Sequence, residues 1–210
     1  MKKIFNKISL LFVLILSFTL IALVGCAPKG RPEETLNAYY DSIKDGDAEG
    51  AYETLCEESK KDFKKQDFIK WINTEKEVFK LKDVKVEKVK DFKGSLNGIK
   101  FKNIVEFKVV KKCEDIFENE EAKQELKQYV VNDNGEWKIY FGNKETGKQL
   151  TSLALNQLAR MYMYGKGDKT ENLDKAASLL EEAIKLNPNN KDAKGNLKAL
   201  SYFKAAKLIK

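Results

Sequence analysis

Few residue types in this chain of 210 residues could carry out chemistry. It contains no histidine, which excludes an imidazole general base, a Ser-His-Asp or Cys-His nucleophile and a His-ligated metal. Its three cysteines, Cys26, Cys56 and Cys113, form no CxxC pair, so a Cys-rich zinc site is excluded as well. Catalysis would have to rest on carboxylates, lysine or tyrosine. We therefore expect no enzyme, no catalytic residues, no metal and no cofactor.

Cys26 follows a segment that is typical of protein export. Residues 1–7 are short and basic, and residues 8–24 carry no charge, which is the arrangement of a secretory signal. That uncharged run also reaches the lower limit of a membrane-spanning helix, so its length alone decides nothing. The residues that come next, Leu23-Val24-Gly25-Cys26, resemble the lipobox of bacterial lipoproteins.

This resemblance implies removal of a signal peptide, residues 1–25, and a diacylglycerol thioether on Cys26. The new amino group is often acylated too, and two or more acyl chains hold a protein stably on a membrane. Residues 26–31 then form a short lipidated tether, in which Pro28 and Gly30 oppose regular structure. We expect the protein on the extracytoplasmic face of the cell membrane, anchored by lipid.

The remaining chain has the composition of a folded protein with mixed surface charge. Lys and Arg outnumber Asp and Glu by 39 to 32, an excess too small to predict nucleic-acid binding. The segment from Leu81 to Lys112 nevertheless holds ten lysines against four acids. These lysines either form a basic face for anionic envelope polymers or lipid headgroups, or only discourage edge-to-edge pairing of strands. Their wide spread favours the second interpretation.

Residues 32–142 are expected to form one α+β domain that begins with helices. Pro32, Glu33 and Glu34 suit a first helical turn, and apolar residues follow at helical spacing (Leu36, Tyr39, Tyr40, Ile43). Residues 44–47 end this helix, and Asp47 can cap the next one. A further helix is expected from about Asp67, because apolar residues recur there at helical intervals (Phe68, Trp71, Ile72, Val78, Phe79).

Strands are expected after Leu81, where the period of the pattern changes. Alternate positions from residue 99 are apolar (Phe101, Val105, Phe107, Val109), which predicts a half-buried strand. Residues 126–131 and 137–141 flank the run 132–135, whose Asn-Gly supplies the positive φ angles of a hairpin turn. Helices followed by an antiparallel sheet give the α+β class.

This order of elements resembles the nuclear-transport-factor-like (cystatin-like α+β) superfamily, and within it an uncharacterised family of bacterial lipoprotein domains. The matching runs are 32–35 with Tyr39-Tyr40, 44–47 with Ala51-Tyr52, and 135–139. The resemblance implies helices packed on a curved antiparallel sheet in the shape of a cone, which often encloses a pocket. Some members are enzymes that use an Asp or His in an apolar cavity, whereas the acids of this chain lie mostly in charged runs.

Five aromatic residues are the candidates to line such a pocket: Tyr39, Tyr40, Trp71, Phe107 and Trp137. At these spacings aromatic residues are more often plain core, so a small-molecule ligand stays an open alternative. Cys56 and Cys113 lie in the exported part, where they either form a disulfide or remain two buried thiols.

Residues 150–210 return to helical periodicity. The run 158–167 (Leu-Ala-x-x-Tyr-x-x-Gly-x-Gly) and Asp174-Lys175-Ala176 resemble a tetratricopeptide repeat of the Sel-one-like variant. Small residues let its two helices approach closely (Ala159, Ala176, Ala183). A closing helix is expected over 192–209, with a buried stripe made of Leu197, Leu200, Tyr202, Ala205 and Leu208.

One repeat cannot bury its apolar face alone, so this face must pack on the first domain, on a second copy or on another protein. We expect a non-enzymatic protein-interaction or scaffold module of the cell envelope, with a protein partner bound through residues 150–210. The alternative is a cone that binds a small molecule or is weakly catalytic, with the repeat as a structural cap.

Overall fold

The computed structural model describes residues 28–142 and 144–208. The expected signal peptide and the lipidation site at Cys26 lie outside these residues. No helix in the described ranges is both long enough and apolar enough to cross a membrane. The elements follow in the order α2 (Pro32–Asp45), α3 (Ala48–Glu53), α4 (Glu57–Asp62), α5 (Lys65–Val78), β1 (Phe79–Leu96), β2 (Ile99–Asp115), β3 (Glu120–Asp133), β4 (Glu136–Tyr140), α6 (Lys144–Tyr164), α7 (Leu173–Leu186) and α8 (Lys191–Leu208).

The first helices form where the sequence pattern places them. Pro32 opens α2, which ends at Gly46 with a left-handed φ of 79° that glycine adopts without strain. Asp47 then caps α3 by accepting a hydrogen bond from the Gly50 amide at 2.8 Å. The helix expected from about Asp67 begins slightly earlier and becomes α5.

The sheet has four antiparallel strands in the order β1-β2-β3-β4. The predicted hairpin joins β3 to β4, with Asn134 at φ 54° and Gly135 at φ 91° in its turn. Strands β1 and β2 are longer than the sequence pattern indicates, at 18 and 17 residues. Much of β1 is exposed, so its charged central part does not need apolar residues at alternate positions.

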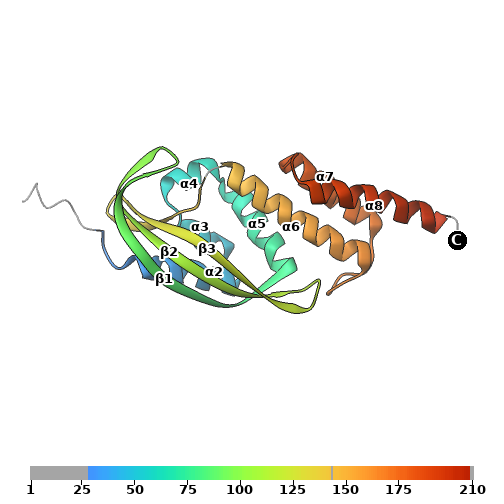
Figure 1. Ribbon diagram of the computed structural model, residues 1–210, viewed down its shortest axis with the longest axis horizontal. Helices are drawn as coiled ribbons and strands as arrows, with labels where there is room; N and C mark the ends of the chain where they lie inside the picture. Colours follow the sequence, from blue (N-terminus) through green and yellow to red (C-terminus); the bar gives the residue numbers. More distant parts are fainter. Residues whose placement is uncertain (1–27, 143, 209–210) are drawn as a thin grey trace, which may run out of the picture.

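The sheet curves around α2, α3 and α5, as Figure 1 shows. Between helices and sheet lies a core in which aromatic rings predominate on the helical side: Leu36, Tyr39, Tyr40, Tyr52, Phe63, Phe68, Trp71 and Ile72, packed on Val105, Phe107, Val109, Val130 and Ile139 of the sheet. This arrangement confirms the expected α+β fold, with helices covering an antiparallel sheet.

Helices α6, α7 and α8 form a second layer of packing beside α5. Their core combines residues of the helices (Leu155, Leu158, Ala159, Met161, Ala176, Leu180, Ala183) with Val78 and Phe117 from the first region. Helix α6 begins at Lys144, ahead of the expected start at residue 150. The apolar face of α6 and α7 is thus covered within the chain.

The expected buried stripe of α8 is only partly correct. Leu200 is buried and Leu197 is partly buried, but Tyr202 is 65% exposed and Ala205 is exposed too. Tyr202 and Ala205 are exposed because no other described helix covers these two side chains. Lys204 reaches Asp174 in the first turn of α7 at 2.6 Å, so the last turn of α8 extends beyond the start of α7. The side chain of Leu208 lies outside the described residues.

Candidate functional site

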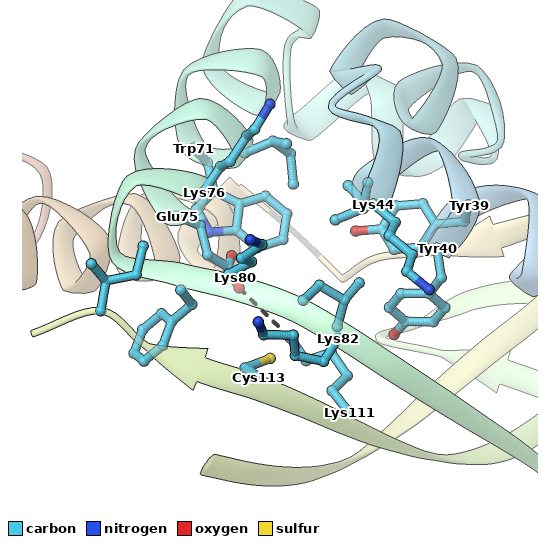
Figure 2. Close-up of a pocket in the computed structure, with 15 residues that line it drawn as sticks. Tyr39, Tyr40, Lys44, Trp71, Glu75, Lys76, Lys80, Lys82, Lys111 and Cys113 are labelled. Atoms are coloured by element: carbon cyan, nitrogen blue, oxygen red, sulfur yellow. Dashed lines mark ion pairs between the residues drawn. The ribbon is translucent and has the colours of Figure 1, made fainter. Parts of the chain in front are cut away.

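A cavity of about 430 Å³ opens where α2 and α5 end above the sheet. Figure 2 shows its wall, which is made by these two helices together with the start of β1 and the end of β2. Its apolar lining consists of Tyr39, Tyr40, Ile43, Trp71, Ile72, Phe79, Leu81 and Ile116. Its polar lining consists of Lys44, Glu75, Lys76, Lys80, Lys82, Lys111 and Cys113.

Local structure accounts for the position of each group. Tyr40 and Lys44 lie one turn apart on α2, as Trp71 and Glu75 do on α5. Pairing of β1 with β2 sets Leu81 opposite Cys113, and so brings two distant parts of the sequence to one wall. The cavity therefore depends on strand register as well as on helix periodicity.

The tyrosines of the cavity are held rigidly and stay protonated. The rings of Tyr39 and Tyr40 meet edge to face with centroids 4.9 Å apart, and the Tyr40 hydroxyl donates to Gln128 Oε1 at 2.8 Å. Burial raises the pKa of Tyr39 well above its usual value, and the pKa of Tyr40 is raised for the same reason. Both hydroxyls are hydrogen-bond donors, not bases, at neutral pH.

Positive charge dominates the polar part of the wall, with five lysines and one carboxylate. Glu75 pairs with Lys111 at 3.6 Å, the pair that the dashed line in Figure 2 marks. Lys82 pairs with Glu114, which lies outside the lining. For Lys44, Lys76 and Lys80 no acidic partner lies within ion-pair distance among residues 28–142 and 144–208. The cavity wall thus combines an apolar lining with an excess of positively charged side chains.

The end of helix α2 stabilises the position of the Lys76 side chain. Its ammonium group lies against Gly46, at the C-terminal end of α2. The unpaired carbonyl groups at a helix C-terminus carry partial negative charge, which favours a cation there. Helix α2 thereby helps to hold one cation beside the cavity.

Cys113 lines the cavity, whereas Cys56 lies elsewhere in a separate cluster with Ile104, Val131 and Tyr140. Both cysteines are free and buried, so the structure has the thiol alternative and not the disulfide. Burial raises the pKa of the Cys113 thiol, and burial likewise raises that of Cys56. Neither is an activated nucleophile.

Of the five aromatic residues predicted to line a pocket, Tyr39, Tyr40 and Trp71 do so. Phe107 is fully buried in the core beneath the helices. Trp137 lies at another part of the domain, where its Nε1 donates to the Gly30 carbonyl at 3.2 Å. Sequence reasoning named Cys113 only for a disulfide or a buried thiol, and Lys82 and Lys111 only as part of the basic segment 81–112. It placed neither these residues nor Glu75 at a pocket, because most of them come from strand ends whose pairing no local pattern reveals.

No cluster of three or more potential metal ligands of the Cys, Asp or Glu type occurs in the described ranges. The acids near the cavity are paired with lysines. The site as built thus offers hydrogen-bond donors, ammonium groups and apolar surface.

The model of a family described as the NTF2-like N-terminal transpeptidase domain matches residues 31–151, which is more than half of the chain. The chain belongs to this family. The match confirms the expected nuclear-transport-factor-like domain, begins just before α2 and ends within α6. The whole cavity therefore lies in the NTF2-like domain, and α7 and α8 lie beyond it. No curated protein matches the chain.

Proposed function

We propose that this protein is an extracytoplasmic lipoprotein, held on the cell membrane by lipid on Cys26, that acts as a non-enzymatic binding module of the cell envelope. Its NTF2-like domain takes a small anionic molecule with an apolar body. The observation that carries this proposal is the cavity itself, with aromatic and aliphatic walls and five lysines against one carboxylate. Pockets of several hundred Å³ with apolar walls and a few placed polar groups are typical of ligand sites.

The protonation states of the cavity support binding over catalysis. General bases and nucleophiles need a group that loses its proton near neutral pH. Burial holds Tyr39, Tyr40 and Cys113 in their protonated forms because it raises each pKa. Glu75 already has Lys111 as its partner. The chain also contains no histidine.

The charge distribution favours a carboxylate or phosphate as the ligand's polar group. Lys80 and Lys44 extend from β1 and α2 at the cavity wall without an acidic partner among the described residues. A bound anion would provide that partner. A hydrogen bond between charged groups contributes about 1.5–3 kcal/mol, which corresponds to roughly tenfold or more in affinity.

Titration with dodecanoate tests this site. The chain has two tryptophans, so Trp137→Phe leaves Trp71 in the cavity wall as the only tryptophan reporter. We expect dodecanoate to change Trp71 emission saturably, and dodecyltrimethylammonium to have no such effect. Lys44→Gln with Lys80→Gln should weaken dodecanoate roughly tenfold. Lys191→Gln with Lys194→Gln, on exposed positions of α8, is the matched control. Equal binding of both amphiphiles would refute an anion site.

The lipid anchor needs its own experiment. Cells that express the full chain with Cys26→Ser should incorporate no labelled palmitate into the protein, and the membrane fraction should lose it. Cys56→Ser is the control, because this buried thiol should leave the labelling unchanged. Continued labelling of the Cys26→Ser protein would show that the lipid is attached at another residue and that Cys26 is not the anchor.

A second candidate function, docking of a protein partner through residues 150–210, has support from exposed aromatic residues. Tyr202, Phe203 and Tyr164 are 65%, 41% and 46% exposed, and the rings of Tyr164 and Phe203 meet with centroids 5.7 Å apart. Clustered exposed aromatic rings are a common mark of a docking site.

In-cell crosslinking followed by capture tests the docking surface. Deleting α6 would uncover Val78 and Phe117, so point substitutions are the better choice. Tyr202→Ser with Phe203→Ser should abolish a specific partner that the unchanged chain captures. Lys191→Gln with Lys194→Gln should keep it. If the two aromatic substitutions leave the captured set unchanged, the partner does not bind at this surface.

A further inference from the structure

Residues 29–30 are fixed on the surface of the NTF2-like domain. The Lys29 amide donates to the Gly135 carbonyl at 3.0 Å, and the Trp137 indole donates to the Gly30 carbonyl at 3.2 Å. Both contacts hold residues 29–30 against the β3–β4 hairpin. Cys26 precedes Lys29 by three residues, which span at most about 11 Å when fully extended. A lipid on Cys26 would therefore hold this end of the domain at the bilayer surface.

A basic hollow lies beside this point. It has a volume of about 800 Å³ and is lined by Pro28, three lysines (Lys93, Lys100, Lys102), Phe101, Asn103 and residues 132–135. All three lysines are exposed. Asp133 is the acid of this lining, and its carboxylate already accepts a hydrogen bond from the Glu57 amide at 2.8 Å. The sequence between Asp91 and Glu106 contains no acid.

We propose that these three lysines, the hairpin lysines, form a membrane-facing surface that binds the phosphate groups of anionic phospholipids. The spread of the lysines along the sequence favours a role against strand pairing, but the fold brings these three to one hollow. The proposal rests on the lipid anchor proposed for Cys26. Ionic attraction between exposed charges reaches about 8 Å at physiological salt, and a short tether keeps the hairpin lysines near that range. Lysines close to an anionic leaflet gain binding energy from its surface potential.

The apolar residues of the same hairpin indicate that it binds at the headgroups without insertion. Leu96, Ile99 and Phe101 are partly buried and pack on the cluster formed around Ile104 and Tyr140. The Phe101 and Tyr140 rings lie 5.7 Å apart between centroids. Because these side chains pack on the protein, the contact with the membrane is left to the lysines.

This contact would also orient the molecule. Figure 1 shows that the first described residues and the tip of the β1–β2 hairpin lie at one end of the long axis, while α8 ends at the other. Two attachments at one end, the lipid and the hairpin lysines, restrict rotation about the tether. The exposed aromatic residues of α8 are then held away from the bilayer.

Lysine footprinting on vesicles tests the surface. The mature chain is coupled through the Cys26 thiol to a maleimide lipid, since Cys56 and Cys113 are buried. The vesicles contain either phosphatidylcholine alone or phosphatidylcholine with about a third phosphatidylglycerol. On the anionic vesicles we expect acylation of Lys93, Lys100 and Lys102 to slow by about fivefold or more. Lys191, Lys194 and Lys198, all exposed on α8, are the internal control and should not change.

Salt and a soluble polymer complete the test. Raising NaCl from about 0.1 M to about 1 M shortens the screening length from about 10 Å to about 3 Å, so the protection should disappear. Equal rates on both vesicle types, or equal slowing of the α8 lysines, would overturn the proposal. A result with a soluble polymer would also overturn it. In that case soluble poly(glycerol phosphate) would slow acylation of the hairpin lysines in the unanchored Cys26→Ser chain, while anionic vesicles would not slow it in the anchored chain. The anchor is imposed chemically here, so a failure of natural lipidation appears only in the palmitate experiment.

Discussion

The two apolar regions of this molecule are built from different side chains, and their packing differs accordingly. Beneath the sheet, aromatic rings touch one another, with centroids 5.5 Å apart for Phe68 and Trp71 and 5.2 Å for Trp71 and Phe141. In the unit of α6, α7 and α8 the interior consists mainly of Leu, Met and Ala. Small residues let helices close on each other, whereas ring contacts fill the space between the helices and the sheet. Three of these aromatic residues, Tyr39, Tyr40 and Trp71, extend the aromatic core to the cavity wall.

Phe68→Ala should have the largest effect, because it breaks the aromatic region at its centre. The ring is fully buried and contacts the rings of Tyr39, Tyr52, Phe63, Trp71 and Phe141. We expect the free energy of unfolding to fall by about 3–5 kcal/mol in urea melts. Tyr202→Ala, at a position that is 65% exposed, should change it by less than about 0.5 kcal/mol. Similar losses for both variants would contradict an aromatic core centred on Phe68.

Leu180→Ala tests whether the second region is independent of the first. The side chain is fully buried on α7, so we expect a loss of about 2–5 kcal/mol. Because Val78 and Phe117 of the first region belong to the same cluster, both regions should unfold in one transition. In a Trp137→Phe background, where Trp71 is the only tryptophan, Trp71 fluorescence and helical circular dichroism should then shift to the same lower midpoint. An unshifted Trp71 transition would show that α6, α7 and α8 unfold separately.

Alkaline pH should weaken the aromatic region in particular. Burial raises the pKa of Tyr39 and Tyr40, so the folded state favours the protonated phenols, while unfolded tyrosines titrate near about pH 10. Their contribution to stability is complete below about pH 10 and is lost as the pH rises above it, at up to about 1.4 kcal/mol per pH unit for each tyrosine. Urea melts between about pH 9 and about pH 11 measure this slope.

Tyr39→Phe with Tyr40→Phe is the matching control for the pH series. The double variant should flatten the loss above about pH 10, while the part that comes from the other groups with a pKa raised by burial, Tyr52, Tyr140 and the two cysteines, should remain. Tyr40→Phe also removes the hydrogen bond to Gln128, so the comparison concerns slopes against pH and not absolute stability. An unchanged slope would mean that other groups cause the alkaline loss.

The elements that the sequence predicts well are those with local causes. Three signals determine the backbone within a few residues of themselves, and each lies where the pattern places it. They are Pro32 with two acids at the start of α2, Gly46 with Asp47 at its end, and the Asn134-Gly135 turn. The helical positions of the three cavity aromatics also follow from local causes, because α2 and α5 have apolar faces, whereas the expectation of a pocket came from the family resemblance. This is why Tyr39, Tyr40 and Trp71 could be proposed and were found at the cavity.

The remaining features depend on tertiary partners that no local pattern contains. Cys113 reaches the cavity through its register with Leu81, and register depends on the whole β1–β2 pairing. Gly147, a poor helix former, lies in α6 because the Phe63 ring packs where a side chain would be. Tyr202 has the spacing of a buried residue, but periodicity cannot tell whether a neighbour is there to cover it.

The smallest effect should come from the ion pairs that join the two regions. Within the described ranges, three such pairs cross the junction: Lys70 with Glu182, Glu77 with Lys169 at 3.0 Å, and Glu118 with Arg160 at 3.5 Å. At least one side chain of each pair is partly exposed to solvent, which screens the attraction. Lys169→Gln should therefore lower the free energy of unfolding by only about 0.2–1 kcal/mol.

Val78→Ala is the reference for this last prediction, because the fully buried Val78 occupies the apolar part of the same junction. Its loss should be about 2 kcal/mol, from two methyl groups removed and the space they leave. Parallel urea melts at low and at high salt separate the two contributions, since only the ionic one is screened. If Lys169→Gln costs as much as Val78→Ala, and salt reproduces that loss, charge rather than apolar contact joins the aromatic region to the helical one.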